Sequence, residues 1–133
     1  TCELNLSCGA RASFDHEKLR QVVVNLITNA VHALQDKQSK GKHLRVSTGL
    51  VDDKYEIRFS DNGIGMTAET QEKVFEPLFS TKGFGVGLGM VIAKNIIDQH
   101  CGEINIESKE GEGTTVTLRL PIIFSGERKS QTI

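Results

Sequence analysis

Apolar residues recur at intervals of three and four between positions 19 and 34, and this run constrains the fold more than any other feature of the chain. They are Leu19, Val22, Val23, Leu26, Ile27, Ala30 and Leu34. The spacing predicts a helix with one buried face, and Asp15, just before the run, is a suitable N-cap. Such a face must be covered by a second layer.

Alternation of apolar and polar residues predicts strands on both sides of this helix. They are expected near Leu4 and Leu6 and at 44–48, 55–59, 104–106 and 116–120. A turn at Asp52-Asp53 joins the second and third strands, and a second helix is expected from about Leu88 to a stop at Gly102. This order predicts an α+β fold with a mixed, mostly antiparallel sheet and its helices on one face.

Composition narrows the class of protein. The 133 residues, 38% of them apolar, fit one globular domain at 1–123 with a polar tail at 124–133. A net charge of −1 argues against a partner that is nucleic acid. Three cysteines without metal-ligand spacing indicate reduced thiols. Without a long apolar run or a leader, we expect a cytoplasmic domain cut from a longer protein, whose membrane attachment stays open.

The segment Asp61-Asn62-Gly63-Ile64-Gly65-Met66 follows the third predicted strand. A carboxylate can accept a hydrogen bond from an exocyclic amine such as that of adenine, and glycines allow the backbone to approach a flat ring. The segment is therefore a candidate purine site. Taken alone, the segment is more often an ordinary turn signal.

Polar residues on the long helix form a second candidate. Asn25, Asn29 and His32 fall within an arc of roughly 60°. An amide oxygen suits a magnesium ion that takes most of its charge balance from phosphates, and the histidine can contact the same anion. The alternative is that all three are surface polar residues.

Alternating glycines precede the second helix at Gly83, Gly85, Gly87 and Gly89. Backbone N–H groups at a helix start form an anion site, and Lys82 can reach a terminal phosphate. Residues 67–89, which contain this run, are expected to form a mobile flap. Flexible glycine loops without a ligand are the common alternative.

Five segments in this order resemble the N, first glycine, phenylalanine, second glycine and closing glycine-threonine boxes of sensor histidine kinases in the GHKL superfamily. They are residues 25–30, 61–66, 74–82, 85–89 and 111–115. Among sensor histidine kinases, the five segments most resemble those of the nitrogen-regulator-like subgroup. The resemblance spans nearly the whole chain and implies the Bergerat ATP-binding fold, a two-layer α/β sandwich.

The resemblance also implies roles for individual residues. Asp61 would accept the adenine amine with help from Thr114 through water, and Asn29 would bind Mg²⁺ with support from Asn25. The expected ring pocket and phosphate loop comprise Gly63, Ile64, Gly65, Lys82, Gly85, Gly87, Leu88 and Gly89. His32 stands where many relatives carry lysine or arginine. Ala33 replaces a frequent aromatic residue, so no stacking contact is predicted.

The implied function is binding of Mg-ATP and donation of its γ-phosphate to a histidine on a separate dimerisation and phosphoacceptor helical domain, with a response regulator downstream. His16 lacks the surroundings of a phosphoacceptor, so the accepting histidine is expected outside this chain. The isolated domain is expected to be a monomer and its parent protein a homodimer. Phe75, Leu78 and Phe79 are expected to dock that domain or simply to anchor the flap.

Two other functions remain open. GHKL serine kinases and ATPases usually carry glutamate where Asn25 stands, and an amide cannot act as their general base. Asn25 therefore favours the histidine kinase. The last alternative is a nucleotide-responsive binding module without chemistry.

Overall fold

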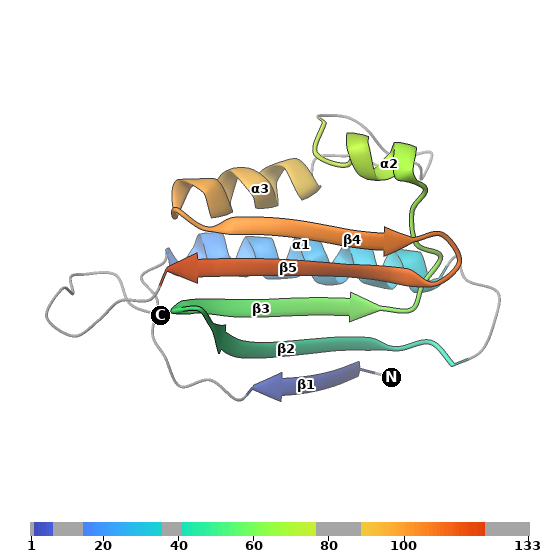
Figure 1. Cartoon of the computed structure of the whole chain (residues 1–133), viewed down its shortest axis with the longest axis horizontal. Helices are drawn as coiled ribbons and strands as arrows, with labels where there is room; N and C mark the ends of the chain where they lie inside the picture. The colour runs from blue at the N-terminus through green and yellow to red at the C-terminus, as the bar shows by residue number, and fades with distance from the viewer. Residues whose placement is uncertain (1, 7–14, 36–40, 77–88, 122–133) are drawn as a thin grey trace, which may run out of the picture.

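The computed structural model describes residues 2–6, 15–35, 41–76 and 89–121, which form one α+β sandwich (Figure 1). Its elements are β1 (Cys2–Leu6), α1 (His16–Gln35), β2 (Leu44–Val51), β3 (Lys54–Asp61), α2 (Ala68–Lys73), α3 (Gly89–Gln99), β4 (Glu103–Lys109) and β5 (Gly113–Pro121). The described strands form a sheet in the order β1-β2-β3-β5-β4. β1 pairs parallel with β2, and all other pairs are antiparallel. The predicted fold class is confirmed.

The core lies between this sheet and the two longer helices, α1 and α3. In Figure 1, α1 lies behind the strands and α3 is seen above β4. Both helices present apolar residues at helical spacing to the inner face of the sheet. The buried core comprises Val22, Leu26, Ala30, Leu44, Val46, Ile57, Phe59, Met90, Ala93, Ile96, Ile97, Leu118 and Leu120. Alternation along each strand therefore sets which side chains face the helices.

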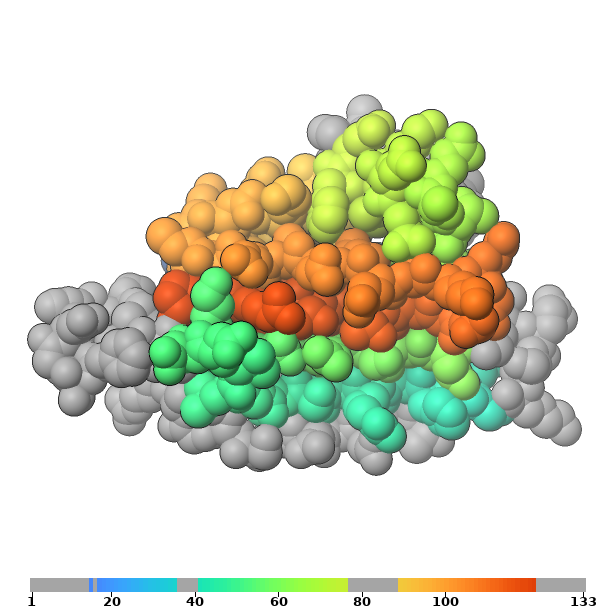
Figure 2. All heavy atoms as spheres, in the orientation of Figure 1, coloured from blue at the N-terminus to red at the C-terminus, as the bar shows by residue number. Residues whose placement is uncertain are grey.

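The opposite face of the sheet is turned toward the viewer in Figure 2. On β3 and β5 this face carries Glu56, Arg58 and Arg119. Glu56 is buried there between two arginines: Arg119 Nε lies 3.1 Å from its Oε2, and an Arg58 amino group lies 3.3 Å from its Oε1. Paired charges explain how a carboxylate can be buried on this face.

Among the described helices, none combines the length and hydropathy that a bilayer crossing needs.

The ends of the two long helices have clear chemical causes. Asp15 caps α1, since its Oδ1 accepts from the backbone N–H groups of Glu17 and Lys18 at 3.0 and 3.2 Å. At the end of α3, Cys101 takes a positive φ of 61°. The predicted stop at Gly102 lies one residue later, and a Cβ there would lie 2.6 Å from the carbonyl oxygen of Arg119. Glycine at 102 is thus required by packing against β5, whereas Cys101 makes the left-handed turn.

Candidate functional site

The site begins with two rows of paired residues. Both rows cross the inner strands β3 and β5 and the edge strand β4. In the last row, Asp61 pairs with Thr114, and Thr114 pairs with Ser108. In the next inward-facing row, Phe59, Val116 and Ile106 are paired in the same way. The sheet therefore offers a polar edge directly beside an apolar floor.

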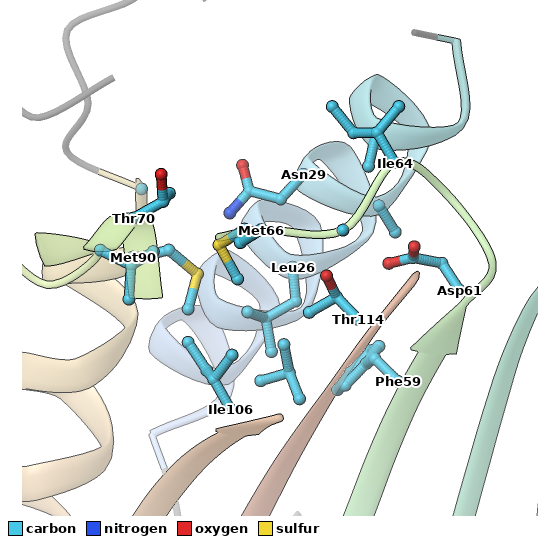
Figure 3. Close-up of a pocket in the computed structure, with 16 residues that line it drawn as sticks. Leu26, Asn29, Phe59, Asp61, Ile64, Met66, Thr70, Met90, Ile106 and Thr114 are labelled. Atoms are coloured by element: carbon cyan, nitrogen blue, oxygen red, sulfur yellow. The ribbon is translucent and has the colours of Figure 1, made fainter. Parts of the chain in front are cut away.

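A pocket of about 180 Å³ lies over these rows (Figure 3). Its walls come from α1, the loop after β3, α2 and the start of α3. They comprise Leu26, Asn29, Ala30, Ala33, Ile64, Gly65, Met66, Thr70, Val74, Gly89 and Met90, in addition to Asp61, Thr114 and the apolar row. The volume is below the roughly 300–1,000 Å³ of sites for whole drug-sized ligands, so the pocket suits a ring system rather than an entire nucleotide.

Asp61 and Thr114 form the polar corner of this pocket, and their oxygens lie side by side in Figure 3. Asp61 Oδ1 accepts from the backbone N–H of Gly63 at 2.8 Å, which fixes the carboxylate relative to the loop. An ionised carboxylate can only accept hydrogen bonds. The corner is therefore suited to a ligand group that donates, such as an aromatic amine.

The two glycines of the loop after β3 have a packing role that the sequence did not indicate. A Cβ at Gly63 would lie 2.8 Å from the backbone and Cβ of Ala33, and a Cβ at Gly65 would collide with the carbonyl oxygen of Lys109. Ile64 adds hydrogen bonds in both directions, from its N–H to Ala33 O at 3.2 Å and to its carbonyl from Gly111 N–H at 2.7 Å. The loop is thus held between α1 and the β4–β5 turn.

The asparagines of α1 occupy different positions. Asn29 lines the pocket, and its Oδ1 lies 4.0 Å from where a Cβ on Gly89 would stand. Asn25 lies one turn earlier, and its Nδ2 donates to the carbonyl of Gly89 at 3.3 Å. Asn25 therefore ties α1 to the first residue of α3. His32 is exposed and is not among the pocket-lining residues.

Several predicted residues cannot be compared with the structure. Lys82, Gly85, Gly87 and Leu88, and with them Leu78, Phe79 and most of the expected flap, lie outside the described residues. Phe75 is described, and it packs against the core with Lys94 Nζ 5.7 Å from its ring centroid. That contact favours the anchoring role of Phe75.

Sequence reasoning missed most of the apolar lining and two polar residues, Thr70 and Ser108. Met90, Ile106 and Thr70 come from three different elements, and nothing in their local sequence brings them together. Ser108 was also missed, although it contacts both Thr114 and the backbone of Met66. A prediction of the strand register would have revealed Ser108, because it lies directly opposite Thr114.

Comparisons with known proteins show to which proteins the chain is similar. The chain is 41% identical over 115 residues to the signal transduction histidine-protein kinase AtoS of Escherichia coli (strain K12), covering 86% of this chain and 18% of that protein. It is 37% identical over 124 residues to the sensor histidine kinase ZraS of Klebsiella oxytoca, covering 91% of this chain and 25% of that protein. The chain thus spans a quarter or less of the length of these relatives.

The structure is also similar to the nucleotide-free catalytic domain of the histidine kinase ThkA. That likeness has a TM-score of 0.77 at 28% identity and covers 90% of this chain and 78% of that one. These matches confirm the resemblance to histidine kinase catalytic domains, while the nitrogen-regulator-like subgroup stays a prediction. The family model described as histidine kinase-, DNA gyrase B- and HSP90-like ATPase matches residues 14–123, and the chain therefore belongs to this ATPase family.

Proposed function

We propose that this chain is the catalytic domain of a sensor histidine kinase, which binds Mg-ATP and donates the γ-phosphate to a histidine on a separate helical domain. The observation that carries the proposal is the Asp61–Thr114 pair at the polar edge of an apolar pocket. The adenine ring fits the apolar floor, and its amine fits the acceptors.

The phosphates would lie on the Asn29 side of the pocket, next to the start of α3. Support comes from Asn29 and Gly89, which both line the pocket, and from the preference of phosphate for helix N-termini. Asn29 offers a hard, neutral amide oxygen, so it would hold Mg²⁺, which supplies charge neutralisation at the phosphates. Lys82, Gly85, Gly87 and Leu88 are assigned to the phosphates by resemblance to the family.

The chain itself would supply positioning and electrostatics rather than the nucleophile. In phosphoryl transfer these two contributions account for most of the catalysis. Asn25 contributes by holding the start of α3 against α1 through its bond to Gly89. The phosphoacceptor histidine belongs to the dimerisation domain of the homodimeric parent, which then passes the phosphoryl group to a response regulator.

Labelling separates this function from its alternatives. The chain is mixed with the parent's dimerisation and phosphoacceptor domain and γ-labelled ATP, and the labelled residue is identified. Label on a histidine of the added domain, lost when that histidine is replaced by glutamine, is the expected result. Label on serine, or release of free phosphate without labelled protein, would instead indicate a serine kinase or an ATPase. Binding without any turnover would indicate a nucleotide-responsive module.

A further inference from the structure

Ser108 lies at the centre of a hydrogen-bond cluster beside the polar corner of the pocket. Its Oγ accepts from the backbone N–H of Met66 at 2.8 Å and donates to the carbonyl of Gly113 at 2.9 Å. A third contact, of 2.8 Å, joins it to Thr114 Oγ1. Ser108 is half-buried and is not itself among the residues that line the pocket.

The direction of the third hydrogen bond follows from counting protons. A serine hydroxyl has one proton and two acceptor lone pairs. The proton of Ser108 is used by Gly113, because a carbonyl can only accept, and one lone pair is used by the N–H of Met66. In the arrangement that satisfies all three contacts at once, Ser108 therefore accepts the proton of Thr114. The hydroxyl of Thr114 then has only lone pairs left for a ligand.

This polarity affects ligand choice because Thr114 stands directly beside Asp61 on the neighbouring strand. With the proton of Thr114 turned toward Ser108, both side chains at the polar corner act as acceptors. An amino group, which donates, is compatible with two acceptors, directly or through a water. A carbonyl oxygen at the same place of the ring would leave acceptors facing an acceptor, at the cost of unpaired polar groups.

We propose that Ser108 is a positioning residue for base selectivity: by holding the proton of Thr114, it keeps the pocket selective for a 6-aminopurine over a 6-oxopurine. The inference rests on the proposed function, since it requires that the nucleotide base occupy this pocket. It adds a residue that acts through Thr114 and extends the recognition unit to a third strand.

The test compares the dissociation constants of ATP and inosine triphosphate, which carries a carbonyl oxygen in place of the adenine amine. In the Ser108→Ala variant, the proton of Thr114 is free to turn toward the pocket and to donate to that carbonyl. We expect the preference for ATP over inosine triphosphate to fall by about three- to tenfold, the equivalent of roughly one net hydrogen bond. Calorimetric titration of both nucleotides measures this ratio.

Ser60→Ala is the matched control, because Ser60 on β3 forms a similar 3.0 Å hydroxyl pair with Thr115 on β5, one position along from Asp61 and Thr114. Ser60 and Thr115 do not line the pocket. The control is expected to show the same ratio of the two dissociation constants as the chain without substitutions. Ser108→Thr, which retains a hydroxyl, is expected to restore selectivity.

Each outcome decides between distinct readings. If Ser108→Ala weakens ATP and inosine triphosphate equally, Ser108 supports only the structure and the proposal is wrong. Should that variant fail to fold, Thr114→Val replaces it, since valine removes the acceptor that Ser108 is proposed to orient; an unchanged ratio there also overturns the proposal. If the chain without substitutions binds neither nucleotide, the proposed function is wrong instead.

Discussion

The substitution Gly65→Ala tests how the loop after β3 is held in place. Gly65 has a φ of +69°, and an added Cβ would collide with the carbonyl oxygen of Lys109. The left-handed conformation alone costs an alanine about 1–2 kcal/mol. Overpacking that forces the backbone to shift adds about 1–3 kcal/mol. We therefore expect the free energy of unfolding to fall by about 3 kcal/mol.

Two other glycines of the chain separate these contributions. Gly111 has a φ of +85° with nothing within 4 Å of an added Cβ, so Gly111→Ala should show only the conformational cost, about 1–2 kcal/mol. Gly49, in β2, has neither a positive φ nor a close neighbour. Gly49→Ala should be neutral or stabilise by up to about 1 kcal/mol, because alanine restricts the unfolded chain.

Urea denaturation, monitored by circular dichroism, gives the free energy of unfolding of all three variants. Calorimetry gives the affinity for ATP at a temperature where each variant is folded. The loop cannot shift without disturbing Asp61, whose carboxylate is tied to it through Gly63. Gly65→Ala should therefore also weaken ATP binding, whereas Gly111→Ala should not. Equal destabilisation by Gly65→Ala and Gly111→Ala would refute the close approach of Gly65 to the β4–β5 turn.

Three further substitutions address individual site residues. Asp61→Asn should weaken ATP binding by about 10- to 100-fold, because it replaces an acceptor at the base edge by a donor. Asp53→Asn, at the distant β2–β3 turn, removes the same charge and should leave ATP binding unchanged. If calorimetry gives Asp61→Asn the same affinity as the unsubstituted chain, Asp61 does not belong to the site. Asn29→Asp should move the magnesium titration of ATP binding to lower concentration, since a carboxylate is a stronger ligand for a hard cation; an unchanged titration would count against Asn29 as the ligand. Asn25→Asp should lower the free energy of unfolding by about 1–3 kcal/mol, because its carboxylate would face the carbonyl at the start of α3. Asn95→Asp, at an exposed position of α3, serves as the control in thermal and urea unfolding. Equal stability of the two variants would contradict a stabilising hydrogen bond between Asn25 and Gly89.

Local patterns predicted the elements well because each has a strong local cause. The helical spacing from Leu19 to Leu34 and the cap at Asp15 correspond to α1, His16–Gln35. The turn at Asp52-Asp53 is confirmed by positive φ values of 52° and 63°, which suit a tight hairpin. These features depend on residues close in sequence, so they can be recognised without knowing the fold.

The pairing of distant segments could not be predicted in this way. Nothing local indicates that β5 inserts between β3 and β4, and this order is what brings Thr114 between Asp61 and Ser108. The same limit applies to Gly63, whose need for a missing Cβ arises from Ala33 on α1. The Asp61 motif was visible in the sequence, whereas the partners that orient it depend on tertiary contacts.

The register between β3 and β5 links nucleotide affinity to folding. A slip of one residue would turn Thr114 to the other face of the sheet and separate it from Asp61. Only the native pairing would then retain ATP, so the nucleotide would act as a thermodynamic ligand of the folded state. At a free concentration one hundred times its dissociation constant, ATP would add about 2.7 kcal/mol to the stability of the domain. A cell rich in ATP would thereby protect this domain from proteolysis, and energy depletion would withdraw that protection.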